Sequence, residues 1–205
     1  MPKRGYHHGN LRQALVDAAL ELIEVKGPTG FTLSEAAKQA GVTPAAVYRH
    51  FAGREDLIAE AARQGYIIFA DLMQYAYEKG QPSALAAFSA TGRAYLAFAR
   101  KYPGHYIAMF ESGISVNRTA DLAAVAGKAN AVLEKAATDL SQHIPADRRP
   151  PAAMFSAHIW AMSHGVVELF ARNSPGSASP FPADELLESG IGIYLRGLGL
   201  IAADD

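Results

Sequence analysis

Apolar side chains recur along this chain with the three- to four-residue period of amphipathic α-helices, and alternating strand patterns are scarce. The first helix is expected at about residues 9–26. It ends at Gly27 and Pro28, because glycine suits the left-handed cap that closes many helices. Its apolar stripe consists of Leu11, Leu15, Ala18, Ala19, Leu22 and Ile23. The pattern predicts an all-α protein.

Two short helices joined by a tight turn are expected next. Thr32 and Glu35 stand three residues apart, the spacing of a capping box, so a helix is predicted to start at Thr32 and to end before Gly41. Thr43 is placed to cap the following helix, with Pro44 at its first position, where a missing N–H costs nothing. Such closely spaced start and stop signals predict a helix-turn-helix.

The rest of the chain continues the helical pattern. Helices are expected at residues 55–78, 83–101, 103–112, 119–142, 151–172 and 184–202. Glycine, serine and proline mark a loop at 173–182. The sequence therefore predicts about nine helices, divided into a small domain at residues 1–54 and a helical bundle at residues 55–205.

Charge is unevenly distributed between these two parts. Residues 1–54 carry seven Lys or Arg against four Asp or Glu, whereas residues 55–205 carry twelve against sixteen. Only the smaller part is therefore suited to a polyanion such as DNA. Half of all residues are apolar and 19% are charged, which is typical of a globular chain.

Several classes of function are disfavoured. The absence of cysteine excludes disulfides, thiolate zinc sites and cysteine nucleophiles. His158 and His164 are six residues apart and point to different sides of a helix, so they do not form a metal pair. No serine elbow, P-loop or paired acidic motif occurs, so we expect neither an enzyme nor a cofactor. No signal peptide is visible, and no apolar run reaches the ~20 residues that a membrane helix needs, so we expect a cytoplasmic protein without a membrane partner.

The second helix of the helix-turn-helix has two different faces. Val47 and Phe51 share one face and are expected to anchor the helix to the core. On the other face, Ala45 and Ala46 leave room for the helix backbone to enter the major groove deeply. Arg49 can make a bidentate contact to guanine or bind a phosphate, and the sequence leaves both open.

Other side chains near this helix are expected to bind the DNA backbone. Tyr48 and His50 are suited to donate to phosphates, which fixes the register of a protein on DNA. Two threonine hydroxyls, a further arginine and a short basic N-terminal arm add to them, although that arm is equally consistent with a solvated terminus. The expected DNA-binding residues are Lys3, Arg4, Thr32, Thr43, Ala45, Ala46, Tyr48, Arg49, His50 and Arg54.

Three motifs surround this helix: Gly41-Val42-Thr43-Pro44, Val47-Tyr48-Arg49-His50-Phe51 and Arg54-Glu55-Asp56-Leu57. Together they resemble the signature of TetR-family transcriptional regulators, and residues 15–23 resemble that family's first helix. The resemblance implies a homodimer that binds a palindromic operator in double-stranded DNA, usually as a repressor. It also implies a larger domain that binds a small effector, here expected to be hydrophobic, and a dimer built by the last two helices.

Trp160-Ala-Met-Ser-His164-Gly165 resembles the Trp-x-x-x-His-Gly motif of one class of TetR C-terminal domains. The resemblance further implies a pocket wall at residues 105–111. His164 and Glu168 share a helix face and could form a polar pair inside the bundle; the alternative is a buried histidine that a neighbour satisfies, with no ligand involved. The candidate effector-binding residues are Tyr66, Phe69, His105, Phe110, Trp160 and His164. The sequence does not exclude a helix-turn-helix protein that has no effector and acts constitutively or through a protein partner.

Four glycines stand in the last expected helix: Gly190, Gly192, Gly197 and Gly199. A glycine inside a helix costs about 1 kcal/mol relative to alanine. We therefore expect another backbone to approach this helix closely, both from helix 151–172 and from its symmetry mate.

Overall fold

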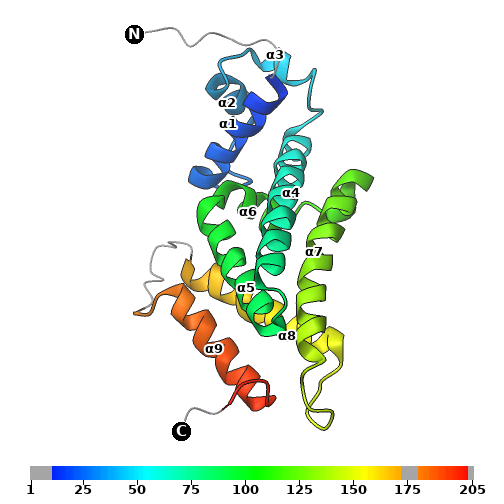
Figure 1. The fold of residues 1–205 in the computed structure, drawn as a ribbon. Coiled ribbons are helices and arrows are strands. Elements are labelled where there is room, and N and C mark those ends of the chain that lie inside the picture. The colour runs from blue at the N-terminus through cyan, green and yellow to red at the C-terminus, as the bar shows by residue number, and fades with distance from the viewer. Residues whose placement is uncertain (1–10, 172–179, 203–205) are drawn as a thin grey trace. The chain divides into compact units, whose positions relative to one another are not determined.

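The structure of the protein, a computed structural model, describes residues 11–171 and 180–202 (Figure 1). Within these ranges it contains nine α-helices and no strand, so the predicted all-α class is confirmed. The predicted basic arm at Lys3 and Arg4 lies outside the described residues, as does most of the predicted loop at 173–182.

The observed helices follow the predicted order closely. Their bounds are α1 Leu11–Lys26, α2 Leu33–Gln39, α3 Pro44–Val47, α4 Arg54–Gly80, α5 Ala84–Lys101, α6 Pro103–Phe110, α7 Ala120–Ser141, α8 Ala152–Val166 and α9 Ala183–Gly197. A short 3₁₀ turn at Val116–Arg118 precedes α7. The single helix predicted at 151–172 is wrong in its last turn, because Val167–Ala171 forms a π-helical turn after α8.

The last helix ends earlier than the predicted residue 202. Gly199 has a φ of 77°, and its N–H donates to the carbonyl of Arg196 at 2.9 Å. The N–H of Leu200 donates to the carbonyl of Leu195 at 3.0 Å, which completes a Schellman motif. Gly199 therefore closes α9, and the prediction that it stands inside the helix was wrong.

The chain forms two compact units. The first, called the head, contains α1 to α3, α4 as far as Ile67, and the segment Tyr102–Ala126 with α6. The second, called the body, contains Ile68–Lys101, α7 from Gly127, α8 and α9. The predicted boundary after residue 54 divides the chain by expected function rather than by compactness, and it stays a prediction.

The head is built around α1. Five of the six predicted stripe residues of this helix are buried, and Leu11 at its start is half-buried. Side chains from α2, from the α3 region and from the start of α4 close the core over them. Burial of each large apolar side chain contributes about 1.5–3 kcal/mol. The core residues of these elements include Leu15, Val16, Ile23, Phe31, Ala36, Val47, Phe51 and Leu57.

Helix α6 belongs to the head because it packs directly on α1. The N–H of Gly104, in the first turn of α6, donates to the carboxylate of Glu24 at 3.1 Å. A Cβ added at Gly104 would lie 2.9 Å from the carbonyl oxygen of Leu20. Only glycine therefore fits at this helix crossing without a backbone shift.

Replacing Gly104 with alanine is expected to lower the free energy of unfolding by about 1–3 kcal/mol, because the added methyl group overpacks the contact between α1 and α6. Gly92 in α5 is the matched control, since a Cβ there meets nothing within 4 Å. Gly92→Ala is expected to stabilise the protein by about 0.5–1 kcal/mol, the usual gain inside a helix. Urea unfolding of the two variants measures both changes, and a stabilised Gly104→Ala variant would contradict the packing.

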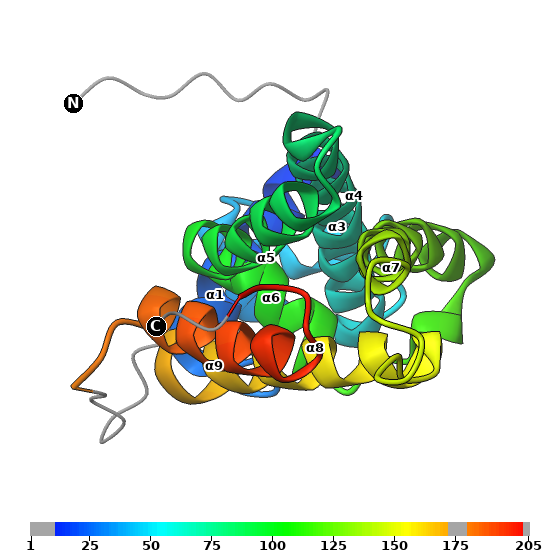
Figure 2. The same cartoon turned by 60° about the horizontal axis from the view of Figure 1, so that its bottom comes forward.

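In the body, α8 and α9 lie side by side in both views (Figures 1 and 2). The side chains of Phe88, Leu140, Phe155 and Leu195 form a buried apolar cluster that joins α5, α7, α8 and α9. The ring of Phe155 also stacks on Tyr194, with 5.9 Å between the centroids. This cluster holds α9 in place without using its glycines.

Candidate nucleic-acid interface

The first helix of the helix-turn-helix begins at the predicted capping box. The N–H of Glu35 donates to the Thr32 hydroxyl at 3.2 Å, and the Thr32 N–H donates to the Glu35 carboxylate at 2.8 Å. The Lys26 ammonium also donates to Glu35, at 2.6 Å. These bonds, first that of Lys26 and then those of Thr32, lower the pKa of Glu35 to about 2. The capping box therefore fixes the start of α2 against the end of α1.

The turn between α2 and α3 is a second Schellman motif. Gly41 has a φ of 73°, and its N–H donates to the carbonyl of Lys38 at 3.1 Å. The N–H of Val42 donates to the carbonyl of Ala37 at 2.9 Å. A residue with a side chain is strained at such a positive φ, so glycine sets the angle between the two helices.

Helix α3 starts where the sequence predicts. Thr43 occupies the N-cap position with extended backbone, and Pro44 follows at the first helical position. The predicted capping by the Thr43 side chain was wrong, because the structure gives this hydroxyl no capping hydrogen bond. The proline already removes one of the amide donors that a cap would satisfy, and Thr43 stands exposed.

The predicted anchors of α3 are buried. Val47 is 0% and Phe51 4% exposed, and the N–H groups of His50 and Phe51 both donate to the carbonyl of Val47. Tyr48 and Arg49 thus lie on a turn that continues the four-residue helix. The turn presents its side chains outward while Val47 and Phe51 hold it to the head.

Most predicted DNA-binding residues near α3 are accessible. Ala46 is half-buried, and the other residues of this set are exposed, Tyr48 to 62%. Their contacts with DNA stay a prediction, and so does the choice between a base and a phosphate for Arg49. The exposed residues of the set are Thr43, Ala45, Tyr48, Arg49 and His50.

Two further predicted DNA-binding residues are engaged within the head. The Thr32 hydroxyl serves the capping box, and the Arg54 guanidinium donates to the carbonyls of Thr29 and Phe31 at 2.9 and 3.2 Å. Arg54 therefore ties the start of α4 to the loop before α2. In this arrangement both side chains stabilise the helix-turn-helix itself.

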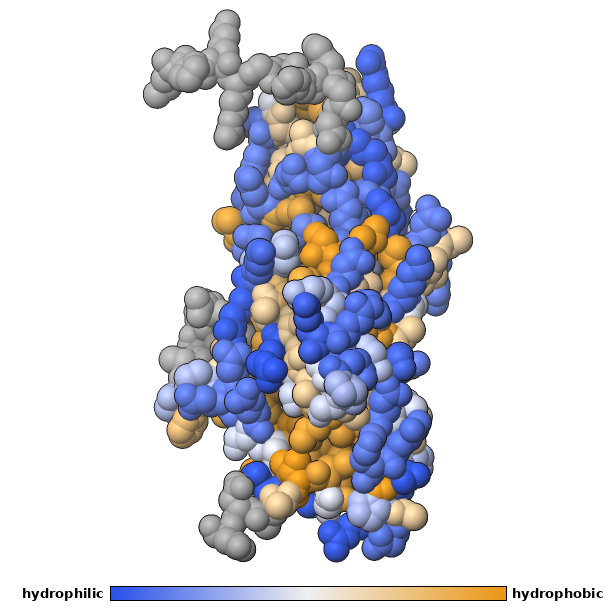
Figure 3. Space-filling model, in the orientation of Figure 1, coloured by the Kyte–Doolittle hydropathy of each residue, from blue (hydrophilic) through white to orange (hydrophobic). Residues whose placement is uncertain are grey.

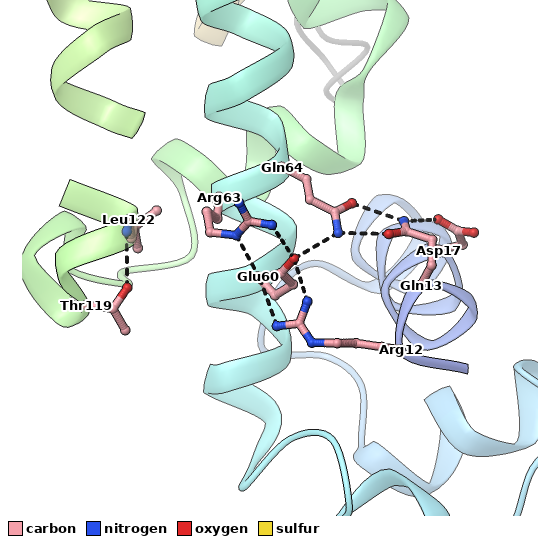
Figure 4. Close-up of polar contacts among 8 residues, drawn as sticks. All are labelled: Arg12, Gln13, Asp17, Glu60, Arg63, Gln64, Thr119 and Leu122. Atoms are coloured by element: carbon pink, nitrogen blue, oxygen red, sulfur yellow. Dashed lines mark hydrogen bonds and ion pairs between the residues drawn. The ribbon is translucent and has the colours of Figure 1, made fainter. Parts of the chain in front are cut away.

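A polar network that the sequence did not predict joins α1 to α4 (Figure 4). The Glu60 side chain is 7% exposed and accepts from Arg12 at 2.8 and 3.0 Å. It also accepts from Arg63 at 2.8 and 2.9 Å and from Gln64 at 3.0 Å. Gln64 and Gln13 exchange two further hydrogen bonds between the helices, at 2.9 and 3.0 Å. One buried carboxylate is thus satisfied by donors from both helices.

Burial by itself raises the pKa of Glu60, but the hydrogen bonds from Arg63, Arg12 and Gln64 outweigh it and lower the pKa to about 2. Since the unfolded chain binds a proton at this position below its ordinary pKa of 4.5, acid favours unfolding between that value and about 2. The variant Glu60→Gln is expected to lose less free energy of unfolding over this interval than the wild type. Urea unfolding from neutral pH down to about pH 3 compares the two slopes, and equal slopes would contradict the assignment.

A second ion-pair cluster holds the start of α4. The Arg118 guanidinium, in the 3₁₀ turn before α7, contacts the carboxylates of Glu55 and Asp56 at 2.9 and 2.6 Å. All three residues belong to the head. The carboxylates lie in the first turn of α4, where the helix dipole favours negative charge.

The six candidate effector-binding residues divide between the two units. In the head, the ring of Tyr66 meets that of Phe110 edge to face, with centroids 6.0 Å apart, and burial lowers the pKa of His105. In the body, the rings of Phe69 and Trp160 each lie 5.5 Å from the ring of Tyr95. Their role in effector binding stays a prediction.

The Nδ1 atom of His164 lies 2.8 Å from the Tyr95 hydroxyl. The imidazole also stacks on Trp160, with 5.5 Å between the ring centroids. The Tyr95 hydroxyl therefore gives the imidazole of His164 a hydrogen-bond partner within the chain. The arrangement joins α5 to α8 within the body.

Among residues 11–171 and 180–202, no group of three or more His, Cys, Asp or Glu is arranged to hold a metal ion. Over the same part of the chain, none of the helices has the length and apolar character needed to span a bilayer.

The comparisons with known proteins agree with this geometry. Residues 15–61 match the family model described as bacterial regulatory proteins, tetR family, and residues 88–194 match that of the tetracyclin repressor-like C-terminal domain. The second match alone covers more than half of the chain, so the chain belongs to the TetR family. The members of this family and the related proteins are transcriptional regulators rather than enzymes. The narrower Trp-x-x-x-His-Gly class stays a prediction.

Related curated sequences match part of the chain. The HTH-type transcriptional regulator BetI of Rhizobium meliloti is 43% identical over 63 residues, covering 31% of this chain and 30% of that protein. The uncharacterized HTH-type regulator YobS of Bacillus subtilis is 31% identical over 99 residues, covering 48% of this chain and 50% of that protein. The chain thus spans half or less of the length of these curated relatives.

Solved structures match over nearly the whole chain. A protein of unknown function from Rhodococcus sp. RHA1 has a TM-score of 0.77 at 26% identity, covering 96% of this chain and 99% of that one. The TetR-family regulator PfmR of Thermus thermophilus has a TM-score of 0.71 at 18% identity, covering 90% and 98%, respectively. At that identity the second likeness concerns the fold alone.

Proposed function

We propose that this protein is a ligand-responsive transcriptional repressor. It binds a palindromic operator as a homodimer and leaves the DNA when a small hydrophobic effector binds. The proposal rests on the surface formed by residues 43–50. Val47 and Phe51 anchor this segment in the core, and its small and polar side chains are exposed next to the turn between α2 and α3. In this class of motif the N-terminal residues of the second helix contact base edges in the major groove.

The short length of α3 is the reason to propose a dimer. Four helical residues and one turn offer few contacts, whereas specific protein–DNA interfaces bury about 1,000–2,500 Å² of protein surface. Two copies related by a two-fold axis double the contacts, and they require an operator with the same symmetry.

The last two helices offer an apolar face for a second copy. Met154 on α8 and Ile193 on α9 are 51% and 63% exposed. A Cβ at Gly190 or Gly197 would meet nothing within 4 Å, so these two glycines do not serve the predicted packing of α9 on α8. Gly165 on α8 is equally open. They leave room for a second backbone. Figure 3 shows that hydrophobic residues also reach the surface in the lower part of its view.

Two separate aromatic clusters, one around Tyr95 in the body and one around Tyr66 in the head, are each a candidate site for the effector. Aromatic rings with a few hydroxyl and imidazole groups suit a mainly apolar molecule with one or two polar atoms. The alternative, a DNA-binding protein without an effector, predicts that no small molecule changes operator affinity. With an operator in hand, an unchanged affinity in the presence of hydrophobic ligands shown to bind the protein would favour that alternative.

Selection of bound duplexes from a random DNA pool, at a low and a higher salt concentration, tests the DNA-binding part of the proposal. Phosphate contacts alone weaken steeply with salt and carry no sequence. We expect an inverted repeat that persists at the higher salt. Recovery of unrelated sequences that are lost with salt would contradict a sequence-specific dimer.

A further inference from the structure

We propose that Arg12 is a positioning residue for the recognition helix: it fixes Phe51, and through Phe51 the exposed turn at Tyr48–His50, relative to α1 and α4. The inference rests on the proposed function, because it concerns how α3 is held for DNA binding. Arg12 itself is not assigned a contact with DNA.

The geometry around Phe51 carries this inference. The guanidinium carbon of Arg12 lies 5.1 Å from the centroid of the Phe51 ring, within the range of a cation–π contact. The same guanidinium makes two bonds to Glu60, at 2.8 and 3.0 Å, on a side chain that is 7% exposed. The planar group is therefore fixed by α4 at its nitrogen atoms while it contacts the last residue of the α3 turn.

Helix α3 depends on such a contact more than a long helix would. It has four residues, and Val47 and Phe51 are the buried side chains at its end and in the turn that follows. Phe51 directly follows His50, so a change in the position of its ring moves the backbone that carries the exposed side chains. Interactions that depend on geometry weaken strongly when groups are displaced by about 1 Å.

Arg63 provides a matched control for Arg12. Arg63 bonds the same Glu60 carboxylate at 2.8 and 2.9 Å, but it comes from α4 itself, three residues further along. Arg12 comes from α1 and contacts Phe51. Removing either arginine costs Glu60 one of its two cationic partners, whereas only removal of Arg12 releases the phenylalanine ring.

The test compares Arg12→Gln with Arg63→Gln on the operator selected for the wild type. Thermal unfolding records the loss of stability, and fluorescence anisotropy at several salt concentrations records DNA affinity. We expect a lower Tm for both variants, with the larger shift for Arg12→Gln because it also loses the contact with Phe51. We expect an affinity loss of roughly five- to tenfold for Arg12→Gln alone, because only this variant lets the turn at Tyr48–His50 change position. The slope of log affinity against log salt is expected to stay that of the wild type.

Equal affinity losses in the two variants would overturn the inference, since the network would then be structural only. A slope reduced by about one in Arg12→Gln would also overturn it, because Arg12 would then bind a phosphate. If Arg12→Gln does not fold, Arg12→Lys takes its place, because its single ammonium keeps the charge but cannot bond Glu60 through two nitrogen atoms while a flat face contacts Phe51. The same affinity loss is then expected, and wild-type affinity would overturn the inference. If the wild-type protein selects no specific duplex from the random pool, that result contradicts the proposed function. It is distinguishable from failure of the inference, because it is obtained before any variant is compared.

Discussion

Replacing Ala45 with glutamate is expected to lower operator affinity about a hundredfold or more while the protein stays folded. Ala45 is exposed in the first turn of α3. A longer side chain there keeps the helix backbone away from the groove, and its negative charge faces the phosphates. Like charges brought together at an interface cost several kcal/mol, which corresponds to a hundredfold or greater loss. Fluorescence anisotropy with the selected operator measures the change.

Val25→Glu is the matched control for this variant. It adds the same charge to the head, at a side chain that is 82% exposed near the end of α1. We expect its affinity to stay close to that of the wild type. Ala45→Glu should also keep the wild-type Tm, because an acidic residue in the first turn of a helix favours the helix dipole. Operator binding by Ala45→Glu at wild-type strength would mean that α3 does not enter the groove at this residue.

Replacing Ile193 with aspartate is expected to convert the proposed dimer to a monomer and to lower operator affinity by about a hundredfold or more. Ile193 is 63% exposed on α9, between the open positions at Gly190 and Gly197. Near a two-fold axis the variant places two carboxylates at one interface and removes the apolar area that the two copies share. Loss of the second half-site removes an avidity of about 10²–10⁴. Sedimentation velocity measures the mass, and anisotropy measures the affinity.

Tyr75→Asp is the control for Ile193→Asp, since Tyr75 is 61% exposed in the same unit but lies on α4. It should remain dimeric and bind the operator. A dimeric Ile193→Asp variant with normal affinity would move the interface away from this face of α9.

The helices and the helix-turn-helix were predictable from the sequence because their signals are local. The capping box at Thr32, the turn glycine Gly41 and the proline at the start of α3 each act within a few residues, and all three are observed. The predicted end of α9 was wrong because Gly199 closes the helix and does not continue it. The two kinds of glycine differ in φ, and a sequence does not show φ. The π-helical turn after α8 has the same apolar pattern as the helix before it.

The contacts that organise the head were not predictable in this way. Arg12 and Glu60 are 48 residues apart, and Arg118 is 62 residues from Asp56, so no local pattern links them. The contacts of Arg54 within the head were not predictable for the same reason, because its carbonyl partners lie in a loop far earlier in the chain. A single sequence shows which residues have suitable chemistry, and the tertiary structure decides whether they face a partner within the chain.

We propose that two copies of this chain present α3 to two half-sites of one operator. Anisotropy with three duplexes tests it most directly: the selected inverted repeat, one isolated half-site, and the repeat with about five base pairs inserted at its centre, which is half a helical turn. We predict two chains bound to the intact repeat, and an affinity at least about a hundredfold lower for the other two duplexes. Equal affinity for all three duplexes would contradict the claim, because each copy would then bind DNA by itself.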